Sequence, residues 1–473
     1  MDNVDDYPMM CGLETHVQLP SQTKIFCGCR NPVNIKDERE PNTLTCPTCL
    51  GMPGSKPRTN QKVIELALKA ALALDCRIAK DMYFSRKTYF YPDMSKNFQT
   101  TQFEIPLATS GTIEIDIDGK KKNIRIRRIH IEEDPAKLIH ENNNTLVDYN
   151  RAGVPLIEIV TEPDFTSAKE ARIYLFKLAQ ILEYLDLYNP GSDASIKTDA
   201  NISLKGGERV EVKNITGTKE IERALSYEYI RQKNVCKRGI KITQETRGWN
   251  ASSGTTKLMR KKETEADYGY IFEPDLTEIC IKDKEKDDIK KQLPELPDEK
   301  KARFIKQYDI SQKAAEGITS EQKLADLFEN IAKTVKTDIA ASWIGGPLLK
   351  TLNYNNMAYR TSGLKERWLT ALLLDFQNRK YSDLVTERLL WKMIDDKTDH
   401  ITAAKKYGYS AIDSSLDTKK IIEKVLESNK KAADDYRNGE EKALNYLVGQ
   451  VMKETKGSID ANTARQALIK KIK

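Results

Sequence analysis

The sequence predicts an α+β protein whose first part holds a largely antiparallel sheet and whose later parts are helical. Up to about residue 290, short runs alternate apolar and polar residues, as in Thr112–Asp116, which is the pattern of a half-buried strand. Beyond that point the chain is rich in Lys and Glu, with apolar residues at helical spacing, as at Ile421 and Val425. The length of 473 residues favours about three domains.

Several stretches of the first part carry a strand pattern, and two carry a helical one. The predicted strands are Gly12–Leu19, Thr112–Asp116 with its continuation through Ile124 and Ile126, Pro155–Val160, Ser195–Leu204 and Arg209–Asn214. Asp118-Gly119 stands between two alternating runs and predicts a tight hairpin. The helices predicted between the strands are Gln61–Leu74 and Ser167–Leu185.

Two breaks divide the chain into predicted domains. The charge run at 282–292, followed by Pro294 and Pro297, predicts a boundary near residue 290. A second break is expected near Asp395–Ile401. We therefore expect domains at 1–290, 291–400 and 401–473, the last ending in helices near Ala443–Met452 and Thr463–Ile472.

Composition narrows the class of protein. Charged residues make up 31% of the chain, and the net charge of +7 is a mild basic bias that is compatible with nucleic-acid binding without requiring it. The N-terminal segment to Tyr7 is acidic and lacks the features of a signal peptide. No apolar run reaches the ~18 residues of a membrane span. We expect a soluble, cytoplasmic protein with no membrane partner.

Four of the eight cysteines form two close pairs, Cys27 with Cys29 and Cys46 with Cys49. Two short-spaced thiol pairs joined by a loop place four thiolates around a tetrahedral zinc ion, with no open position for chemistry. The alternative is a set of four unrelated buried thiols. The sequence therefore predicts a structural zinc site, whereas Cys11, Cys76, Cys236 and Cys280 are isolated and suit core positions.

Strand periodicity places several polar side chains on one face of the sheet. Glu14 and His16 share a face of their strand, and Asp199 and Asn201 share one in Ser195–Leu204. Glu158 interrupts an apolar run, where an unpaired charge would be costly. Carboxylates with an imidazole suit Mg²⁺ and nucleotide phosphates. The predicted magnesium ligands are Glu14, His16, Glu132, Glu133, Glu158 and Asp199; the alternative is an ordinary solvated sheet face.

Basic residues accompany these acids. Arg151, Lys96 and Lys213 are candidates for contacting phosphate oxygens, and Arg86 with Lys87 precedes an aromatic run. Each of them taken singly is more often a surface charge. The phosphate-binding loop of P-loop enzymes is absent from the sequence, so any ATP site is of another type.

Several motifs recur in one known family. They are Gly12–Leu19, Cys46–Gly54, Tyr91–Met94, His130–Asp134, Asp148–Asp164, Asp199–Ser203, Val212–Asn214, Gln244–Thr246 and Val451–Gly457. Through them the whole chain resembles the B subunit of the glutamyl/aspartyl-tRNA amidotransferase, and the run Asp148–Asp164 is highly specific. Departures such as Pro135-Ala136 change local loops rather than the overall match.

The resemblance implies a cradle domain related in fold to glutamine synthetase, then a helical domain and a small helical tail that grips tRNA. The cradle is expected to activate the carboxylate of Asp-tRNA(Asn) or Glu-tRNA(Gln) with ATP and Mg²⁺. It then amidates that carboxylate with ammonia channelled from a partner amidase (glutaminase), the A subunit of a three-subunit enzyme that also has a small C subunit. The implied catalytic residues are Glu14, His16, Glu132, Glu133, Glu158 and Arg151, with Lys96, Arg151, Lys213, Asp199 and Asn201 at the cofactor.

Two other functions remain open from the residues alone. One is a zinc-containing tRNA-binding scaffold that has no catalysis of its own, and the other is a free-standing ligase for small carboxylates and amines. The basic helical tail argues against the second. No glutaminase machinery is recognisable, so the ammonia must come from a partner.

Overall fold

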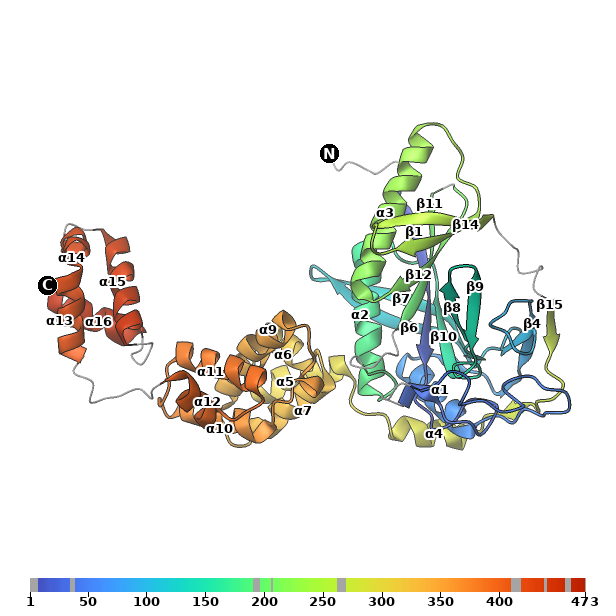
Figure 1. Ribbon diagram of the computed structural model, residues 1–473, viewed down its shortest axis with the longest axis horizontal. Helices are drawn as coiled ribbons and strands as arrows, with labels where there is room; N and C mark the ends of the chain where they lie inside the picture. The colour runs from blue at the N-terminus through green and yellow to red at the C-terminus, as the bar shows by residue number, and fades with distance from the viewer. Residues whose placement is uncertain are drawn as a thin grey trace. The chain divides into compact units, whose positions relative to one another are not determined.

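The computed structural model describes residues 7–34, 39–189, 196–205, 207–261, 269–409, 418–437, 440–455 and 461–472. The first six residues and Ser195, on which part of the sequence interpretation fell, lie outside this set. The chain divides into two compact units, Met1–Leu296 and Pro297–Lys473. The first contains a large, mostly antiparallel sheet and the second is helical, which confirms the predicted fold class (Figure 1).

The first unit is built around a nine-stranded sheet in the order β14-β13-β12-β11-β1-β10-β7-β6-β2. Every neighbouring pair is antiparallel except β12 with β13. The strands are β1 (Met9–Gln18), β2 (Arg77–Ile78), β6 (Ala108–Ile117), β7 (Lys120–Glu133), β10 (Pro155–Thr161), β11 (Lys197–Leu204), β12 (Val210–Thr216), β13 (Glu245–Asn250) and β14 (Thr255–Lys261). Each predicted strand corresponds to one of these within a few residues. The first strand of the chain therefore lies near the middle of the sheet.

The predicted hairpin joins β6 to β7. Ile117 pairs with Lys120, so the loop consists of Asp118 and Gly119 alone. Both loop residues have positive φ, 53° and 84°, as the type I′ turn requires. Asp and Gly adopt this backbone at low cost, which explains why the pair marks the turn in the sequence.

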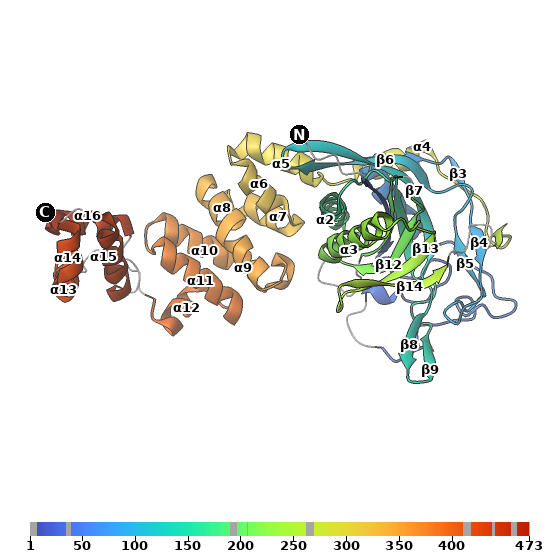
Figure 2. The same cartoon turned by 90° about the horizontal axis from the view of Figure 1, so that it is seen from above.

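The three longest helices described in this unit are α1 (Gln61–Ala73), α2 (Ala168–Tyr184) and α3 (Thr218–Lys237). The first two match the predicted helices, and side chains of Asn60 and Ser167 cap them by accepting backbone N–H bonds. Helices α2 and α3 pack together over one face of the sheet (Figures 1 and 2). The apolar core lies between them and the sheet, so the opposite, polar face is left for other contacts.

Helix α3 was not predicted from the sequence. Its buried face contains Glu228 and Gln232 beside Ile221 and Leu225, so the apolar stripe that marks an amphipathic helix is interrupted. Arg231 balances the Glu228 charge, with Nη2 2.6 Å from Oε1. A buried polar network replaces part of the hydrophobic pattern here.

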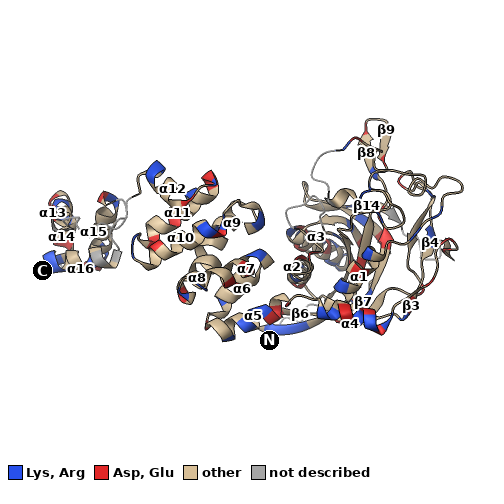
Figure 3. Cartoon of the chain, turned by 90° about the horizontal axis from the view of Figure 1, so that it is seen from below, with Lys and Arg blue, Asp and Glu red and all other residues tan. Residues whose placement is uncertain are grey.

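Smaller elements complete the unit. They are the sheet β15-β4-β5 (Gly269–Phe272, Ser85–Thr88, Phe98–Thr101), the hairpin β8-β9 (Lys137–Glu141, Asn144–Asp148) and the pair β16-β3 (Ile279–Cys280, Asp81–Met82). The charge run near residue 290 forms helix α4 (Asp283–Lys291), which carries both signs of charge and packs against α1 (Figure 3). The first unit therefore continues through this run to Leu296.

The second unit contains two hydrophobic clusters. The larger is formed by α5 (Pro297–Tyr308), α6 (Gln312–Thr319), α7 (Gln322–Ile331), α8 (Thr337–Trp343), the π-helical segment Ile344–Leu348, α9 (Leu349–Tyr354), α10 (Glu366–Gln377), α11 (Asp383–Asp396) and α12 (His400–Tyr407). Ala403 and Ala404 of α12 are buried in it. This cluster therefore extends past the break that the sequence suggested near residue 400.

The smaller cluster joins the last four helices, α13 (Thr418–Ser428), α14 (Lys430–Arg437), α15 (Glu441–Glu454) and α16 (Ala461–Ile472). Ile422, Leu447 and Leu468 meet in its centre. The two terminal helices correspond to those predicted from the sequence. Nowhere in the described ranges does a helix combine the length and apolar character needed to cross a bilayer.

Candidate functional site

The polar face of the large sheet borders a cavity of about 920 Å³. Strands β1, β7, β10, β11 and β12 all contribute side chains to it. Along β1, Glu14, His16 and Gln18 line the cavity, whereas Leu13 and Val17 point into the core. The period of two in the strand predicts this division, and the structure confirms it.

The register of the strands places chemically related residues side by side. Glu158 of β10 pairs with His16 of β1 on one side and with His130 of β7 on the other. On the far side of β1, His16 pairs with Lys197 of β11. Because antiparallel partners lie directly opposite each other, residues far apart in the chain form one row across the cavity floor.

His16, Glu132 and Glu158 form the tightest cluster. Nε2 of His16 lies 3.4 Å from Oε2 of Glu158 and 3.8 Å from Oε1 of Glu132. His130 stands behind them, with Nε2 3.2 Å from Glu158 Oε2 and 3.6 Å from Glu132 Oε2. One ligand atom from each of His16, Glu132 and Glu158 lies within 4.8 Å of the other two, which is close enough for a shared metal ion.

The cluster is strongly coupled electrostatically. Burial lowers the pKa of His16, but its hydrogen bond to Glu158 and the charges of Glu158, Glu132 and Asp199 outweigh that effect and raise the pKa to about 10. The same balance raises the pKa of His130 to about 9. Burial raises the pKa of Glu158, yet the two imidazoles hold it well below the ordinary value. Two carboxylates and two imidazoles therefore share compensating charges.

The neighbouring part of the cavity holds Glu14, Asp199, Asn201, Glu211 and Lys213. Asn201 Nδ2 donates to Glu14 Oε1 at 2.8 Å. Lys213 Nζ contacts Asp199 Oδ2 at 3.0 Å and Glu211 Oε1 at 2.9 Å. Burial and the nearby carboxylates of Glu158 and Glu211 raise the pKa of Glu14. These residues face the same cavity as the His16 cluster but are engaged with one another.

Arg151 also lines the cavity, although its guanidinium is bound to a loop. Nε donates to Pro135 O at 2.8 Å and Nη2 to Ala136 O at 2.7 Å, and Nε lies 3.6 Å from Asp134 Oδ1. The side chain thus holds the segment that follows β7 at the edge of the cavity. A contact from Arg151 to phosphate would use its remaining N–H groups.

Glu133 and Lys96 are not brought to this cluster. Lys96 Nζ forms an ion pair with Glu133, and Thr100 N donates to Glu133 Oε1 at 2.8 Å. Both residues line a second cavity of about 180 Å³, next to Cys27 and Cys49. The sequence grouped Glu133 with the magnesium ligands and Lys96 with the phosphate-binding residues. Glu133 points away from the His16 cluster because it follows Glu132 in β7 and successive residues of a strand point to opposite sides, and Lys96 lies with it on that other side.

Sequence interpretation assigned no role to several residues that line the large cavity. Arg128, Lys197, Arg209 and Lys137 bring positive charge to it, and Glu211 brings negative charge. Strand parity already placed Lys197 on the polar face with Asp199, and it would also have found Arg128 with His130 and Glu211 with Lys213. Arg86, which we considered for phosphate, is bound instead to Glu273 at 2.7 and 2.8 Å, whereas Lys87 does line the cavity.

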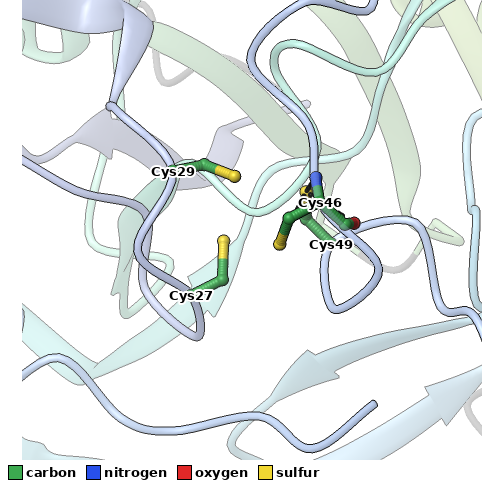
Figure 4. Close-up of side chains that lie close together, drawn as sticks. All are labelled: Cys27, Cys29, Cys46 and Cys49. Atoms are coloured by element: carbon green, nitrogen blue, oxygen red, sulfur yellow. Dashed lines mark hydrogen bonds between the residues drawn. The ribbon is translucent and has the colours of Figure 1, made fainter. Parts of the chain in front are cut away.

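The four clustered cysteines form a separate centre in the segment between β1 and α1. One Sγ from each of Cys27, Cys29, Cys46 and Cys49 lies within 4.8 Å of the others, and their side chains point toward one another (Figure 4). Cys46 N donates to Cys49 Sγ at 3.2 Å, a bond that favours a thiolate. A set of four converging sulfurs fits tetrahedral zinc.

Comparison with known proteins covers nearly the whole chain. Residues 9–287 match the family model described as the GatB/GatE catalytic domain, and residues 326–472 match the model described as the GatB domain. Three similar relatives are B subunits of aspartyl/glutamyl-tRNA(Asn/Gln) amidotransferases. The proteins from Methanosarcina barkeri, Thermoanaerobacter sp. and Methanococcoides burtonii are 44%, 42% and 41% identical, each over 98% of both chains.

These matches agree with the motifs noted in the sequence and with the mixed sheet and helical parts of the fold. The large cavity lies within the range that matches the catalytic-domain model. The chain therefore belongs to the family formed by the B subunits of aspartyl/glutamyl-tRNA(Asn/Gln) amidotransferases.

Proposed function

We propose that this chain carries out the ATP-dependent step of a tRNA-dependent amidotransferase in the cytoplasm. The side-chain carboxylate of Asp-tRNA(Asn) or Glu-tRNA(Gln) receives the γ-phosphoryl group of ATP, and ADP leaves. Ammonia then attacks the activated carbonyl carbon, loses a proton and displaces phosphate, which gives the amide. The step makes phosphate the leaving group, because a carboxylate at neutral pH offers no other good one.

The observation that carries the proposal is the His16, Glu132 and Glu158 cluster on the cavity floor. Two buried carboxylates and one imidazole in ligand reach of a common point suit Mg²⁺. When bound there, Mg²⁺ supplies charge neutralisation for nucleotide phosphates. Glu14 and Asp199 extend the same acidic floor and are proposed as further ligands, held by Asn201 and Lys213.

Basic side chains of the cavity are placed to bind phosphate oxygens. Nε of Arg128 is buried and lacks a hydrogen-bond partner among the described residues, although the residue lines the cavity. An unpaired buried N–H group is costly, and an anionic ligand would satisfy it. Lys197 and Arg209 flank the same cavity. We assign the phosphate contacts to these residues together with Lys213 and Arg151.

The remaining parts have supporting roles in this proposal. The four cysteines hold one structural zinc ion that fixes the loop between β1 and α1. The tail helices bind the tRNA backbone. Ammonia comes from the partner amidase, with the small third subunit completing the enzyme, because the chain has no recognisable glutaminase motif. The relatives are named as subunits of an enzyme, which supports the existence of partner subunits.

ATP hydrolysis that requires both Mg²⁺ and charged tRNA tests the proposal. The chain, purified with its partner subunits, should hydrolyse ATP when given Asp-tRNA(Asn) or Glu-tRNA(Gln), and should not with the uncharged tRNA. A complex that binds the charged tRNA but never hydrolyses ATP would favour the alternative of a zinc-containing tRNA-binding scaffold. Supplying ammonium chloride in place of glutamine separates the chemistry of this chain from that of the amidase.

A further inference from the structure

The side chain of Lys24 is completely buried beside the cysteine cluster. It follows β1 and precedes Cys27, and its exposed fraction is 0%. Its Nζ donates to Leu44 O at 2.8 Å and to Tyr149 O at 3.3 Å, and lies 3.8 Å from Cys49 Sγ. Lysine is seldom buried without a compensating charge, so this position needs an explanation.

The usual explanation, a carboxylate partner, does not apply within the part of the chain that the structure describes. No ion pair joins Lys24 to an Asp or Glu of that part, although many other lysines have one. Two carbonyl oxygens satisfy hydrogen bonds but supply no full negative charge. The sulfur of Cys49 is the anionic group in reach once it is a thiolate.

The cysteine cluster, with zinc bound, would in turn require a nearby positive charge. Four thiolates around one Zn²⁺ leave the centre with a net negative charge, and its surroundings are partly buried. Positive groups and N–H donors around a metal centre offset such charge and stabilise the thiolate ligands. Among these donors, the Cys46 N–H bond to Cys49 Sγ contributes only a dipole. An ammonium group contributes a full charge.

We propose that Lys24 is the counter-charge of the zinc centre and thereby sets its affinity for zinc. The inference rests on the zinc site proposed above. In this role Lys24 is a positioning residue: it stabilises the Cys49 thiolate through space and, through Leu44 and Tyr149, fixes the segments on either side of the cluster.

Packing keeps the ammonium in this place. A Cβ added at Gly153, whose φ is +81°, would lie 3.6 Å from both Lys24 Cδ and Cys49 Cβ and 4.0 Å from Glu133 Oε2. The stem of Lys24 and the side chain of Cys49 therefore both lie beside the Gly153 backbone. Because Lys24 is 0% exposed, its ammonium is kept from water and lies in reach of Leu44 O, Tyr149 O and the Cys49 sulfur.

Zinc competition with a chromophoric chelator tests the proposal on the full chain with its partner subunits. Lys24→Met removes the charge and the donor, whereas Lys24→Gln removes the charge and keeps a donor for the carbonyls. Both should lower zinc affinity by about 10- to 100-fold, as loss of outer ligands to a metal site does. Lys69→Met is the matched control, because Lys69 Nζ donates to Leu185 O at 2.7 Å and is not among the residues around the cysteines. It should leave zinc affinity unchanged.

The outcomes separate the possible roles. If Lys24→Gln binds zinc like the wild type while Lys24→Met does not, Lys24 serves only as a hydrogen-bond donor and the proposal is overturned. If the wild-type chain contains no zinc by elemental analysis, the proposed zinc site itself is wrong. If the wild type binds zinc and both Lys24 variants bind it with the same affinity, the zinc site stands and the proposed role of Lys24 is overturned.

A second variant keeps the test valid if Lys24→Met does not fold. Cys46→His retains four ligands but makes the centre less negative. In that background Lys24→Gln should reduce zinc affinity several-fold less than it does in the wild type, because there is less charge to offset. An equal reduction in both backgrounds would contradict a charge effect. Co²⁺ substitution adds a spectroscopic readout, since the thiolate charge-transfer bands should shift in the Lys24 variants.

Discussion

Glu132 and Glu133 are neighbours in the chain, yet their carboxylates serve opposite sides of β7. On the floor of the large cavity, Glu132 Oε1 lies 3.8 Å from His16 Nε2. Glu133 instead forms an ion pair with Lys96 beside the cysteine cluster. Both side chains are nearly as buried as each other, at 6% and 5% exposure. They therefore form a natural matched pair for testing which side of the strand binds the metal.

Glu132→Gln should reduce the Mg²⁺- and tRNA-dependent hydrolysis of ATP by at least about 10-fold, the lower end of the loss seen even for residues that only orient metal ligands. Glu133→Gln should retain ATP hydrolysis near the wild-type level, because Glu133 is not part of the His16 cluster. Steady-state rates at several Mg²⁺ concentrations measure both. A reversed order of the two effects would place the metal on the other side of the strand.

Glu158→Gln extends this test to the strand at the centre of the cluster. Removing its charge takes away the nearer of the two carboxylate partners of both imidazoles, and Mg²⁺ affinity should fall together with the rate. Leu156 shares the face of Glu158 and lines the same cavity, so Leu156→Met is a control that keeps the charge pattern. Isothermal titration with Mg²⁺ and ATP gives the affinity. Unchanged Mg²⁺ dependence in Glu158→Gln would exclude this residue as a ligand.

Loss of one clustered cysteine should release zinc. Cys46→Ser is expected to lower the zinc content of purified protein well below one ion per chain, because a neutral hydroxyl is a poor zinc ligand. Cys280→Ser should not, since Cys280 is exposed and far from the cluster in sequence. Elemental analysis of both variants, purified side by side, decides the matter. Full zinc occupancy in Cys46→Ser would leave the cysteines without their proposed role.

Removal of residues 410–473 should weaken tRNA binding and reduce its salt dependence. Each lost phosphate contact should reduce the slope of log affinity against log salt by about 1. The cut follows Tyr409 because α12 packs into the preceding helical core, which a cut at residue 400 would damage. Filter binding at several salt concentrations measures both quantities. Unchanged affinity and slope would point to a partner-docking arm or a solubilising extension instead.

The stability of the first unit should depend on pH through Glu170. Burial raises the pKa of Glu170, but hydrogen bonds from Lys122 and Thr166 outweigh burial and lower it. A lowered pKa in the folded state means that its stabilising effect is complete above the ordinary Glu value and is lost as the pH falls through the lower value. Glu170→Gln should therefore cost about 1 to 2 kcal/mol at pH 7 and progressively less below about pH 4.

Urea unfolding of the wild type and the Glu170→Gln variant, at pH 7 and below about pH 4, measures the contribution of Glu170 to the free energy of unfolding. Glu114→Gln provides the control, because Glu114 pairs with Lys121 at an exposed position and should contribute little at either pH. A Glu170→Gln cost that stays constant as the pH falls would show that the contacts act by packing rather than by charge.

Local pattern predicted much of the fold. The strand period placed Glu14 and His16 on the polar face, and Asp118-Gly119 located the hairpin, because both signals depend on neighbouring residues alone. Helix α3 was not predicted because Glu228 and Gln232 occupy its buried face and interrupt the apolar pattern. Their burial is acceptable only with Arg231 and other partners from elsewhere in the unit, which no local pattern reveals.

The site was predictable in its residue types but not in its grouping. Parity indicates that Glu132 and Glu133 cannot share a face, yet the sequence interpretation listed both as magnesium ligands. The register that sets His16 beside Glu158 and His130 is a property of three strands together. Lys96 finds its partner Glu133 at the end of β7, and Arg86 finds Glu273 just after β15, and only the folded chain brings these segments near. Contacts between residues of distant segments were therefore the main feature of the site that the sequence did not predict.

The position of β1 in the sheet has a consequence for how the protein is made. This strand carries Glu14 and His16 and is synthesised before the other strands of the sheet, but its two partners are β10, which begins at Pro155, and β11, which begins at Lys197. At usual translation speeds, the wait for them is on the order of 10 s. During that time β1 has two unpaired edges and an apolar face, which are the features that chaperones bind and that lead nascent chains to aggregate. Two of the residues proposed for the site, Glu14 and His16, thus belong to the strand of the sheet that depends longest on protection during synthesis.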